Sequence, residues 1–503
     1  MPYDALALAG GWLLPLAFAP FDFPACAVVA LFLLFVAWSQ ASPGRAFLRG
    51  YLFGLGQFGF GASWIYISMH DYGGASAAEA GGLTLLFTLF WALYPGFAGW
   101  LAARCYSGHP AFSASVVFPA AYTLADWLRS WFPTGFPWLQ VGYSQIDTPL
   151  AGLAPVLGSY GVGWATALLA GLTLALVRLR RPQRPVAAVS LIVLVGASAA
   201  LQRVDWTRPA GAPFKATLLQ GNIPEQIKWQ PEFQRQALET YLGMTREHWG
   251  SPLIVWPETA VPAFYQQVET TVLADLSEEA RRHGTDLLVG IPFYDRTLDR
   301  YYNSVAVLGR TAGFYFKRHL VPFGEYVPLR PVLGWVLDIL QIPLSDFAPG
   351  SADQPPLVAA GYPLGASICY EDTFGHESLA NLPDATYLVN VTNDGWFGDS
   401  IATHQHVQMA RMRALETGRY MLRATNTGIT AIITPKGAVA ATAPPFQKAQ
   451  VSGTITPMQG STPYILWGDV PTVAGFCALL GGLAWWRYRP AAALEPRATE
   501  HDA

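Results

Sequence analysis

One cysteine in this chain stands where a reactive thiol would be useful. Cys369 ends a short apolar run, 364–368, and is followed closely by the carboxylates of Glu371 and Asp372. A strand that delivers a thiol at its C-terminal end, beside acids, is a common way to present a nucleophile. The plainer interpretation is an inert, small apolar side chain, as free cysteines often are. The surrounding residues must decide between the two.

Two other predicted strands also end in ionisable side chains. Glu258 follows the apolar run 253–257, and Lys317 ends the run 314–317. Reacting groups collect at the C-terminal ends of strands in α/β domains, so these side chains could meet Cys369. A carboxylate in a dry environment could accept the thiol proton. An ammonium could favour the thiolate and then face the oxyanion of a tetrahedral intermediate. The three groups together predict covalent catalysis.

Each of these polar residues also has an ordinary structural interpretation. Glu258 could be the N-cap or first-turn acid of a helix, where negative charge is stabilised. Lys317 and Arg318 could form a solvated basic turn, and Glu325 could simply close the turn at Gly324. The residues alone leave these alternatives open.

The sequence predicts neither a metal centre nor a cofactor. His404 and His406 lie two positions apart on a predicted helix, so their side chains should point apart and not share a metal ion. The segment 393–395 is an ordinary turn signal, although the aromatic pair that follows it is unusual for a solvent loop. The remaining cysteines lie in or beside apolar segments, and none is an evident disulfide partner for Cys369.

The elements that must position these groups alternate between strands and helices. Between residues 213 and 458, short runs rich in β-branched and aromatic residues alternate with amphipathic segments, which predicts a layered α/β domain. The predicted strands are 215–220, 253–257, 286–291, 304–308, 314–317, 365–369, 386–391, 420–424 and 430–434. The predicted helices are 231–248, 268–283 and 404–419.

The rest of the chain has the composition of a membrane protein. Of all residues 52% are hydrophobic and 13% are charged, whereas a soluble protein has about 25% charged residues. The net charge of −3 gives no reason to expect a nucleic-acid partner. Apolar stretches long enough to cross the bilayer occur mostly at the two ends of the chain. The predicted spans are 4–20, 24–40, 47–68, 80–103, 111–131, 150–177, 185–202 and 466–486.

Arginines follow every second predicted span, which sets an orientation by the positive-inside rule. They are Arg45, Arg49, Arg104, Arg178, Arg180, Arg181, Arg184, Arg487 and Arg489. The intervening short loops carry acids and histidine, with Arg129 the one basic exception. We therefore expect both termini in the cytoplasm and the hydrophilic block on the opposite side. The predicted organisation is a seven-helix membrane domain over 1–205, the α/β domain over 213–458, an eighth transmembrane helix over 464–489 and a disordered cytoplasmic tail over 490–503.

Beyond these patterns, the motifs around the three strand ends resemble those of the nitrilase superfamily. They are Trp256-Pro257-Glu258, the run from Lys317 to Glu325 and Cys369-Tyr370-Glu371. The full architecture is similar to that of the apolipoprotein N-acyltransferases, the bacterial family that adds a third acyl chain to lipoproteins. Further matching segments are 220–224 with 228–229, 302–304, 393–400, 408–416, 135–140 and 142–145.

The resemblance implies a fold and a set of roles. The fold would be a multi-span helical membrane domain with an extracytoplasmic α-β-β-α sandwich. Glu258 would be the general base, Lys317 the cation that stabilises the oxyanion and Cys369 the nucleophile. The implied supporting residues are Glu325 beside Lys317, Tyr370 and Glu371 lining the thioester site, and Trp229 and Asn303 at its entrance.

The resemblance also implies partners and a location. The acyl donor would be a phospholipid, phosphatidylethanolamine above all, and the acceptor the α-amine of diacylglyceryl-cysteine in an apolipoprotein. We expect a monomer in the bacterial inner membrane, without a cofactor, its catalytic domain in the periplasm. The segment 333–343 would be either an amphipathic arm at the membrane interface or a core helix.

Two rival functions remain at this stage. One is a membrane-anchored amidase or nitrilase that acts on a small carbon-nitrogen substrate, since the superfamily shares the three residues. The other is a transporter with a catalytically dead extracytoplasmic domain. Against it, the predicted spans hold few ionisable residues, with Asp126 and Arg129 the main candidates.

Overall fold

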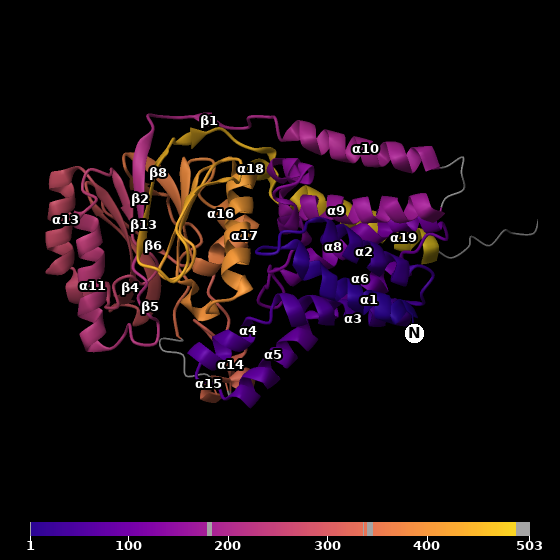
Figure 1. Cartoon of the computed structure of the whole chain (residues 1–503), viewed down its shortest axis with the longest axis horizontal. Coiled ribbons are helices and arrows are strands. Elements are labelled where there is room, and N and C mark those ends of the chain that lie inside the picture. The colour runs from indigo at the N-terminus through magenta and orange to yellow at the C-terminus, as the bar shows by residue number, and fades with distance from the viewer. Residues whose placement is uncertain (1, 179–183, 335, 340–345, 489–503) are drawn as a thin grey trace, which may run out of the picture.

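A block of β-sheets lies beside a bundle of helices in the computed structural model (Figure 1), which describes residues 2–178, 184–334, 336–339 and 346–488. The predicted tail, 490–503, lies outside the described residues. So do Arg180, Arg181 and Arg489 of the arginine pattern, and residues 335 and 340–343 of the proposed arm.

Two six-stranded sheets form the hydrophilic half. The strand order is β13-β2-β3-β4-β5-β6 in one sheet and β12-β11-β10-β9-β8-β7 in the other. The bounds in the first are β2 Phe214–Gln220, β3 Leu253–Val255, β4 Asp286–Asp295, β5 Arg300–Gly309, β6 Gly313–Phe316 and β13 Ala449–Ile455. In the second they are β7 Leu357–Ala359, β8 Tyr362–Ile368, β9 Tyr387–Thr392, β10 Met421–Thr425, β11 Ala431–Ile433 and β12 Val439–Thr442.

The two sheets pack face to face and carry helices on their outer faces. Leu218 and Leu288 of the first sheet share a buried core with Ile368 and Val389 of the second. Helices α11 (Pro231–Arg246) and α13 (Val272–His283) cover the outer face of the first sheet, and α17 (Ile401–Thr417) covers that of the second. The predicted α-β-β-α sandwich is thereby confirmed.

The central strands are parallel, which explains why they were visible in the sequence. β2, β3 and β4 run parallel, as do β8, β9 and β10, and strands of this kind read as continuous apolar runs because both faces are buried. The prediction missed β7, β12 and β13. The polar side chains of β13 alternate with apolar ones. The strand is specified by its antiparallel pairing with β2 more than by its own composition.

The other half consists of helices. They include α1 Pro2–Leu13, α2 Ala25–Trp38, α3 Pro43–Gly61, α5 Ala77–Trp91, α6 Leu93–Arg104, α8 Phe118–Arg129, α9 Ala154–Arg178, α10 Arg184–Leu201 and α19 Val470–Tyr488. Glycines allow close helix approach: a Cβ on Gly11 would lie 2.0 Å from the carbonyl oxygen of Phe53, and one on Gly50 equally close to that of Pro95. Among the described residues, Ala77–Arg104, Pro149–Arg178 and Arg184–Leu201 are long and apolar enough to cross a membrane.

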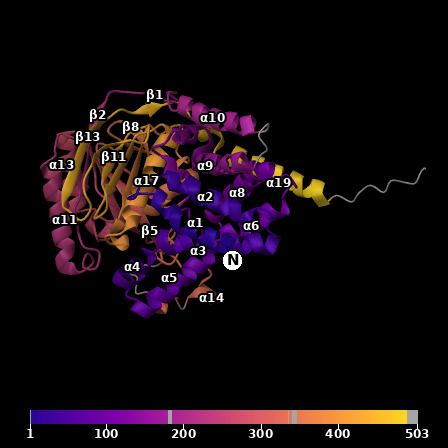
Figure 2. The same ribbon diagram turned by 45° about the vertical axis from the view of Figure 1, so that its right-hand side comes forward.

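Helix α17 joins the two halves, and both views place it between the sheets and the helical bundle (Figure 1 and Figure 2). The indole of Trp138 donates a hydrogen bond to the side-chain oxygen of Gln405 on this helix, at 2.6 Å. Next to it, the Tyr143 hydroxyl donates to the carbonyl of Thr373 at 3.0 Å. The turn that follows β8 therefore lies against the helical half.

Candidate active site

Cys369 lies on a sharp turn between β8 and a short 3-10 helix, Cys369–Thr373. Its φ of 52° lies in the left-handed region, which residues with a side chain rarely adopt. Neighbouring groups hold this conformation: the Glu371 carboxylate accepts a hydrogen bond from the Ile368 N–H at 2.6 Å, and the Asn390 amide donates to the Cys369 carbonyl at 3.2 Å. A strained strand-to-helix turn of this kind pushes a nucleophile out of the sheet.

Two carboxylates, a lysine and an asparagine form a buried cluster at the ends of the first sheet's strands. The Lys317 ammonium lies 2.8 Å from Glu325 and 3.7 Å from Glu258. The Asn303 amide donates to both acids, at 2.7 Å to Glu258 and 2.9 Å to Glu325. Backbone bonds fix the base of the cluster, because the Lys317 N–H donates to the Asn303 carbonyl at 2.9 Å. The predicted base, cation and second acid therefore lie together.

The charges of this cluster change the pKa of the Cys369 thiol. Burial raises the pKa of the Cys369 thiol, Glu258 raises it further, and Lys317 acts in the opposite direction. Burial likewise raises the pKa of Glu258, with Lys317 opposing. For Lys317, burial acts to lower the pKa, but Glu325 and Glu258 outweigh it and the pKa is raised. At neutral pH the resting site therefore holds a protonated thiol beside a charged ammonium.

The raised pKa of Cys369 predicts slow alkylation by iodoacetamide at neutral pH. Because the thiolate is the reactive form, the labelling rate should rise about tenfold per pH unit and continue to rise beyond pH 9. Peptide mass spectrometry of labelled protein measures this at Cys369, with an added cysteine-containing peptide as the reference. A labelling rate that levels off below pH 8 would show a preformed thiolate and contradict the prediction.

The remaining predicted site residues occupy different positions. Glu371 lies behind the turn of Cys369, where its carboxylate accepts hydrogen bonds from the Arg318 and His319 N–H groups at 2.7 and 3.1 Å, as well as from the Tyr315 hydroxyl at 3.0 Å. It thus ties the segment after β6 to the turn of Cys369. Tyr370 points to the helical half, where its hydroxyl donates to the carbonyl of Gly135 at 3.0 Å. Trp229 is half-buried in the segment before α11, outside the cluster.

One group of side chains has the composition of a metal site. The ligand atoms of His319, His376 and Glu377 lie within 4.8 Å of one another. Arg318 also lies 3.0 Å from the Glu377 carboxylate and competes for it. A guanidinium in that position fits an ion-pair cluster better than a divalent cation.

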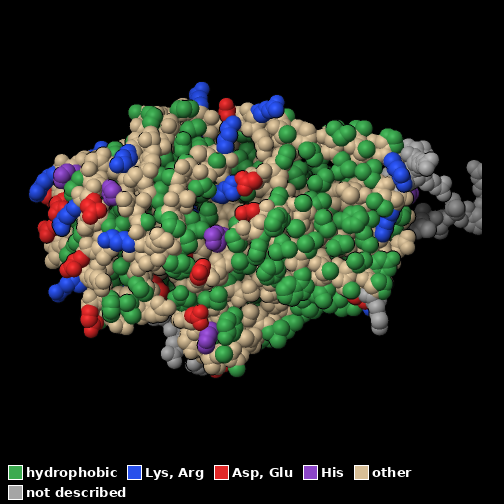
Figure 3. All heavy atoms as spheres, viewed as in Figure 1, with side chains coloured by type: hydrophobic (Ala, Val, Ile, Leu, Met, Phe, Trp, Pro, Cys, Tyr) green, Lys and Arg blue, Asp and Glu red, His purple; other side chains and the backbone are tan. Residues whose placement is uncertain are grey.

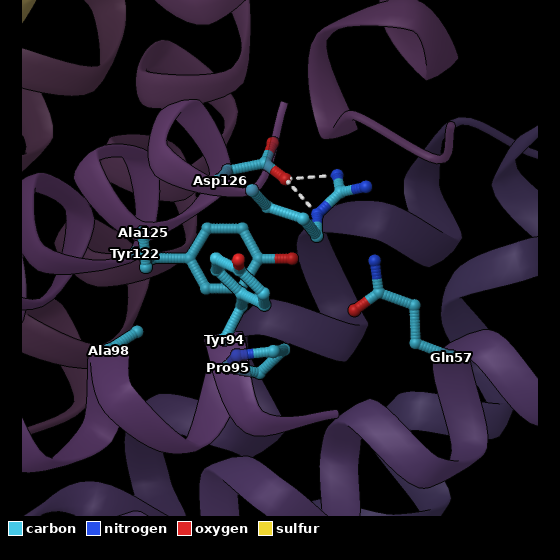
Figure 4. A pocket seen from close by; sticks show the side chains of 8 residues that line it. Gln57, Tyr94, Pro95, Ala98, Tyr122, Ala125 and Asp126 are labelled. Atoms are coloured by element: carbon cyan, nitrogen blue, oxygen red, sulfur yellow. Dashed lines mark hydrogen bonds and ion pairs between the residues drawn. The ribbon is translucent and has the colours of Figure 1, made fainter. Parts of the chain in front are cut away.

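The Asp126–Arg129 ion pair of the helical half holds the segment 136–138 in place. Arg129 is 1% exposed, and besides Asp126 it donates to the carbonyls of Phe136 and, at 2.8 Å, Trp138. Asp126 and Arg129 also line a small cavity, whose wall includes the side chains of Gln57, Tyr94 and Tyr122 shown in Figure 4. With a volume of about 10 Å³ the cavity has room for about one water molecule, not for a transported solute.

Sequence reasoning overlooked a second buried cluster around His406. Asp372, Asp394 and Arg423 surround this histidine, and all four side chains are 0% exposed. The signal that could have found it is the aromatic pair 396–397, which is out of place in a solvent loop.

Comparisons with known proteins cover nearly the whole chain. Residues 10–172 match the family described as the apolipoprotein N-acyltransferase N-terminal domain, and residues 215–464 match carbon-nitrogen hydrolase. A relative from Methylococcus capsulatus, named apolipoprotein N-acyltransferase, is 56% identical over 96% of both chains. Relatives of the same name from Nitrosomonas europaea and Azotobacter vinelandii are each 44% identical. They cover 93% and 97% of this chain, and 94% and 96% of their own.

Proposed function

The chain belongs to the apolipoprotein N-acyltransferase family, and on this premise we propose that it acylates lipoproteins through a thioester on Cys369. The enzyme's class follows from relatives that match it from end to end. The route through Cys369 is supported above all by one observation: the strained turn presents this thiol to a buried Glu258–Lys317 pair that alters its pKa.

In the first step, the Cys369 sulfur attacks an ester carbonyl of the phospholipid. Glu258 takes the thiol proton as the carbon–sulfur bond forms, because the raised pKa of the thiol leaves it protonated until then. The negative charge that develops on the carbonyl oxygen faces the Lys317 ammonium. When the tetrahedral intermediate collapses, the carbon–oxygen ester bond breaks, lysophospholipid leaves with the proton held by Glu258, and the acyl chain stays on sulfur.

In the second step, the neutral α-amine of diacylglyceryl-cysteine attacks the thioester. Glu258 accepts a proton from the attacking nitrogen, the carbon–sulfur bond breaks, and the proton passes to the departing thiolate. The product is an amide, and the enzyme regains its thiol. A thioester is reactive toward an amine in a way that a plain ester is not, which is the benefit of dividing the transfer into two steps.

The site needs its pair of acids for different tasks. Glu325 lies closest to Lys317 and also accepts the Val321 N–H at 2.8 Å, so it is a fixed counter-ion. Glu258 is farther from the ammonium, at 3.7 Å, and is the acid left available for proton transfer. Asn303, bonded to both, keeps the two carboxylates apart and oriented. Tyr370 and Trp229 belong to the substrate-facing surroundings in this proposal.

The membrane placement completes the proposal. Figure 3 shows hydrophobic side chains covering the helical half, with charged ones gathered over the sheet half and at the far end of the helices. With this distribution, three helices long and apolar enough to cross a membrane and the arginine pattern in support, the enzyme would have eight spans in the bacterial inner membrane, both termini cytoplasmic and the sandwich periplasmic. The membrane domain would cover 1–205, the catalytic domain 213–458 and the last span 464–489. The enzyme would act as a monomer, and a phospholipid such as phosphatidylethanolamine would reach the site from the bilayer.

Intact mass spectrometry tests the proposal. Purified enzyme supplied with phosphatidylethanolamine should gain the mass of one acyl chain, and a diacylglyceryl-cysteine lipopeptide should then remove that mass and become triacylated. If phospholipid leaves the mass of the protein unchanged, the proposed route is wrong. Hydrolysis of a short aliphatic amide or nitrile in the same preparation would instead support the amidase alternative, which the full-length relatives do not favour.

A further inference from the structure

Four charged side chains that the mechanism does not use lie buried directly behind the nucleophile's turn. The two ring nitrogens of His406 face different carboxylates: Nε2 lies 2.8 Å from Asp372, and Nδ1 lies 3.0 Å from Asp394. Arg423 bonds to the same two acids, at 2.9 Å to Asp372 and 3.0 Å to Asp394. We call this set the His406 cluster.

The geometry determines the charge of the histidine. A neutral imidazole can donate through one nitrogen only, whereas two carboxylates call for two donors. Both acids also accept hydrogen bonds from a guanidinium, which keeps them ionised. His406 must therefore be an imidazolium. Two positive and two negative charges then balance within a cluster that has no access to water.

The electrostatics of the individual groups agree with this assignment. Burial and Arg423 act to lower the pKa of His406, but Asp372 and Asp394 outweigh them, so the pKa is raised. Burial acts to raise the pKa of Asp394, whereas Arg423 and His406 bring it down to about 2. The Cys369 thiol also lies near enough to the cluster to help raise the pKa of Arg423.

The cluster connects the four elements around the nucleophile. The cluster draws Asp372 from the 3-10 helix that begins at Cys369, Asp394 from the 3-10 helix after β9, His406 from α17 and Arg423 from β10. Arg423 also donates to the side-chain oxygen of Asn390 at 2.8 Å, and the amide of the same asparagine donates to the Cys369 carbonyl. A single chain of hydrogen bonds thus leads from the imidazolium to the backbone of the nucleophile.

The cluster also reaches the helical half. The ring of Trp138 lies 5.5 Å from the His406 ring, and Phe397 lies 6.0 Å from it, so aromatic rings border the cation. Trp138 in turn is fixed through its carbonyl by Arg129 and through its indole by Gln405. A displacement of His406 would therefore shift both the turn of Cys369 and Trp138 of the helical half.

From this arrangement we propose that His406 is a positioning residue for acyl transfer: as a buried imidazolium between Asp372 and Asp394, it holds the turn of Cys369 in its attacking conformation. The inference rests on the proposed thioester route. The charge balance of the His406 cluster should affect the rate of the Cys369 attack but not the binding of phospholipid, because the cluster touches neither substrate.

Three variants of the full-length enzyme in lipid nanodiscs test the proposal: His406→Gln, Asp372→Asn and the double variant. His406→Gln leaves one buried negative charge in excess, and the rate constant of thioester formation should fall about 100-fold with an unchanged KM for phosphatidylethanolamine, since a small misplacement of a reacting group has an effect of this size. The double variant has balanced charges again, so its rate constant should be at least about tenfold higher than that of His406→Gln. His404→Gln, a matched change two residues earlier on α17, should retain the wild-type rate.

The outcomes separate this inference from the proposed function. If wild-type enzyme forms no thioester, the proposed function fails; if wild type forms it and His406→Gln matches it, only the positioning role fails. A double variant no better than the single one would also overturn the role of charge balance. If neither His406→Gln nor the double variant folds, the cluster is a folding element and the proposal is wrong.

Wild-type protein offers a direct check of the protonation state. Solid-state NMR of ¹⁵N-histidine-labelled enzyme should show one imidazolium at pH 8, where histidines with an ordinary pKa of about 6.5 are neutral. The signal should persist in His404→Gln. Only neutral histidines at pH 8 would overturn the assignment, whatever the activity.

Discussion

Replacement of Cys369 by serine is expected to abolish the acyl adduct and to lower turnover on the order of 10⁵-fold, as loss of a nucleophile does in other covalent enzymes. The hydroxyl is a far weaker nucleophile than the thiol at the same position, and Glu258, a carboxylate, is too weak a base to activate it. The protein should still fold, because serine preserves the size of the side chain and the left-handed turn is held by Glu371 and Asn390. Intact mass and lipopeptide acylation measure the loss.

The matched control for this prediction is Cys477→Ser, the same chemical change at an exposed position on α19. It should retain both adduct and turnover. A Cys369→Ser enzyme that transfers acyl chains within tenfold of wild type would show that another group carries the acyl chain, and the roles assigned to Glu258 and Lys317 would fail with it.

The second large effect is expected for Glu258→Gln. Loss of a general base typically lowers a rate by about 10²- to 10⁴-fold, and both steps use this carboxylate, so we expect about 10³-fold in kcat. The glutamine oxygen can still accept the Asn303 hydrogen bond, and Glu325 still neutralises Lys317, so the geometry should persist. Single-turnover thioester formation and its discharge by lipopeptide measure the two steps separately.

The pH dependence of the wild type provides an independent check of the same role. The base must be ionised, and burial raises its pKa above 4.5, so activity should fall as the pH falls through that raised value. The acid limb of kcat should be absent in Glu258→Gln, whose residual activity no longer depends on this ionisation. An identical acid limb in both proteins would assign the limb to another group.

The same pKa shift gives the sign of the stability effect. Because the folded-state pKa of Glu258 lies above its unfolded value, the folded protein binds more protons in that window, and stability decreases as pH rises through it. At neutral pH the ionised carboxylate therefore destabilises the fold, and Glu258→Gln should melt at the wild-type temperature or above it. Glu279→Gln, on the solvent side of α13, is the matched control and should lose no activity. A marked decrease in the melting temperature of Glu258→Gln would show that the carboxylate has a structural role.

The sequence was informative wherever burial imposes a pattern on it. The parallel central strands lie between two apolar layers, so most of their residues are apolar, and the runs in β3 and β8 end close to a polar residue. Those ends are where Glu258 and Cys369 stand. The position and chemical type of the proposed reacting groups could therefore be predicted without coordinates.

Tertiary structure alone decided which polar residues meet. From the sequence His406 was expected only to point away from His404, because neither its neighbours on α17 nor its spacing from His404 indicates a partner. Its partners lie on three other elements, Asp372, Asp394 and Arg423, and no local pattern links residues so far apart in the chain. The same reason explains why Glu371, two residues after Cys369, accepts hydrogen bonds from the segment after β6. By itself the sequence determined the apolar elements and the chemistry at their ends, since these depend on local burial; the fold decided the hydrogen-bond and charge networks, since these depend on contacts between distant segments.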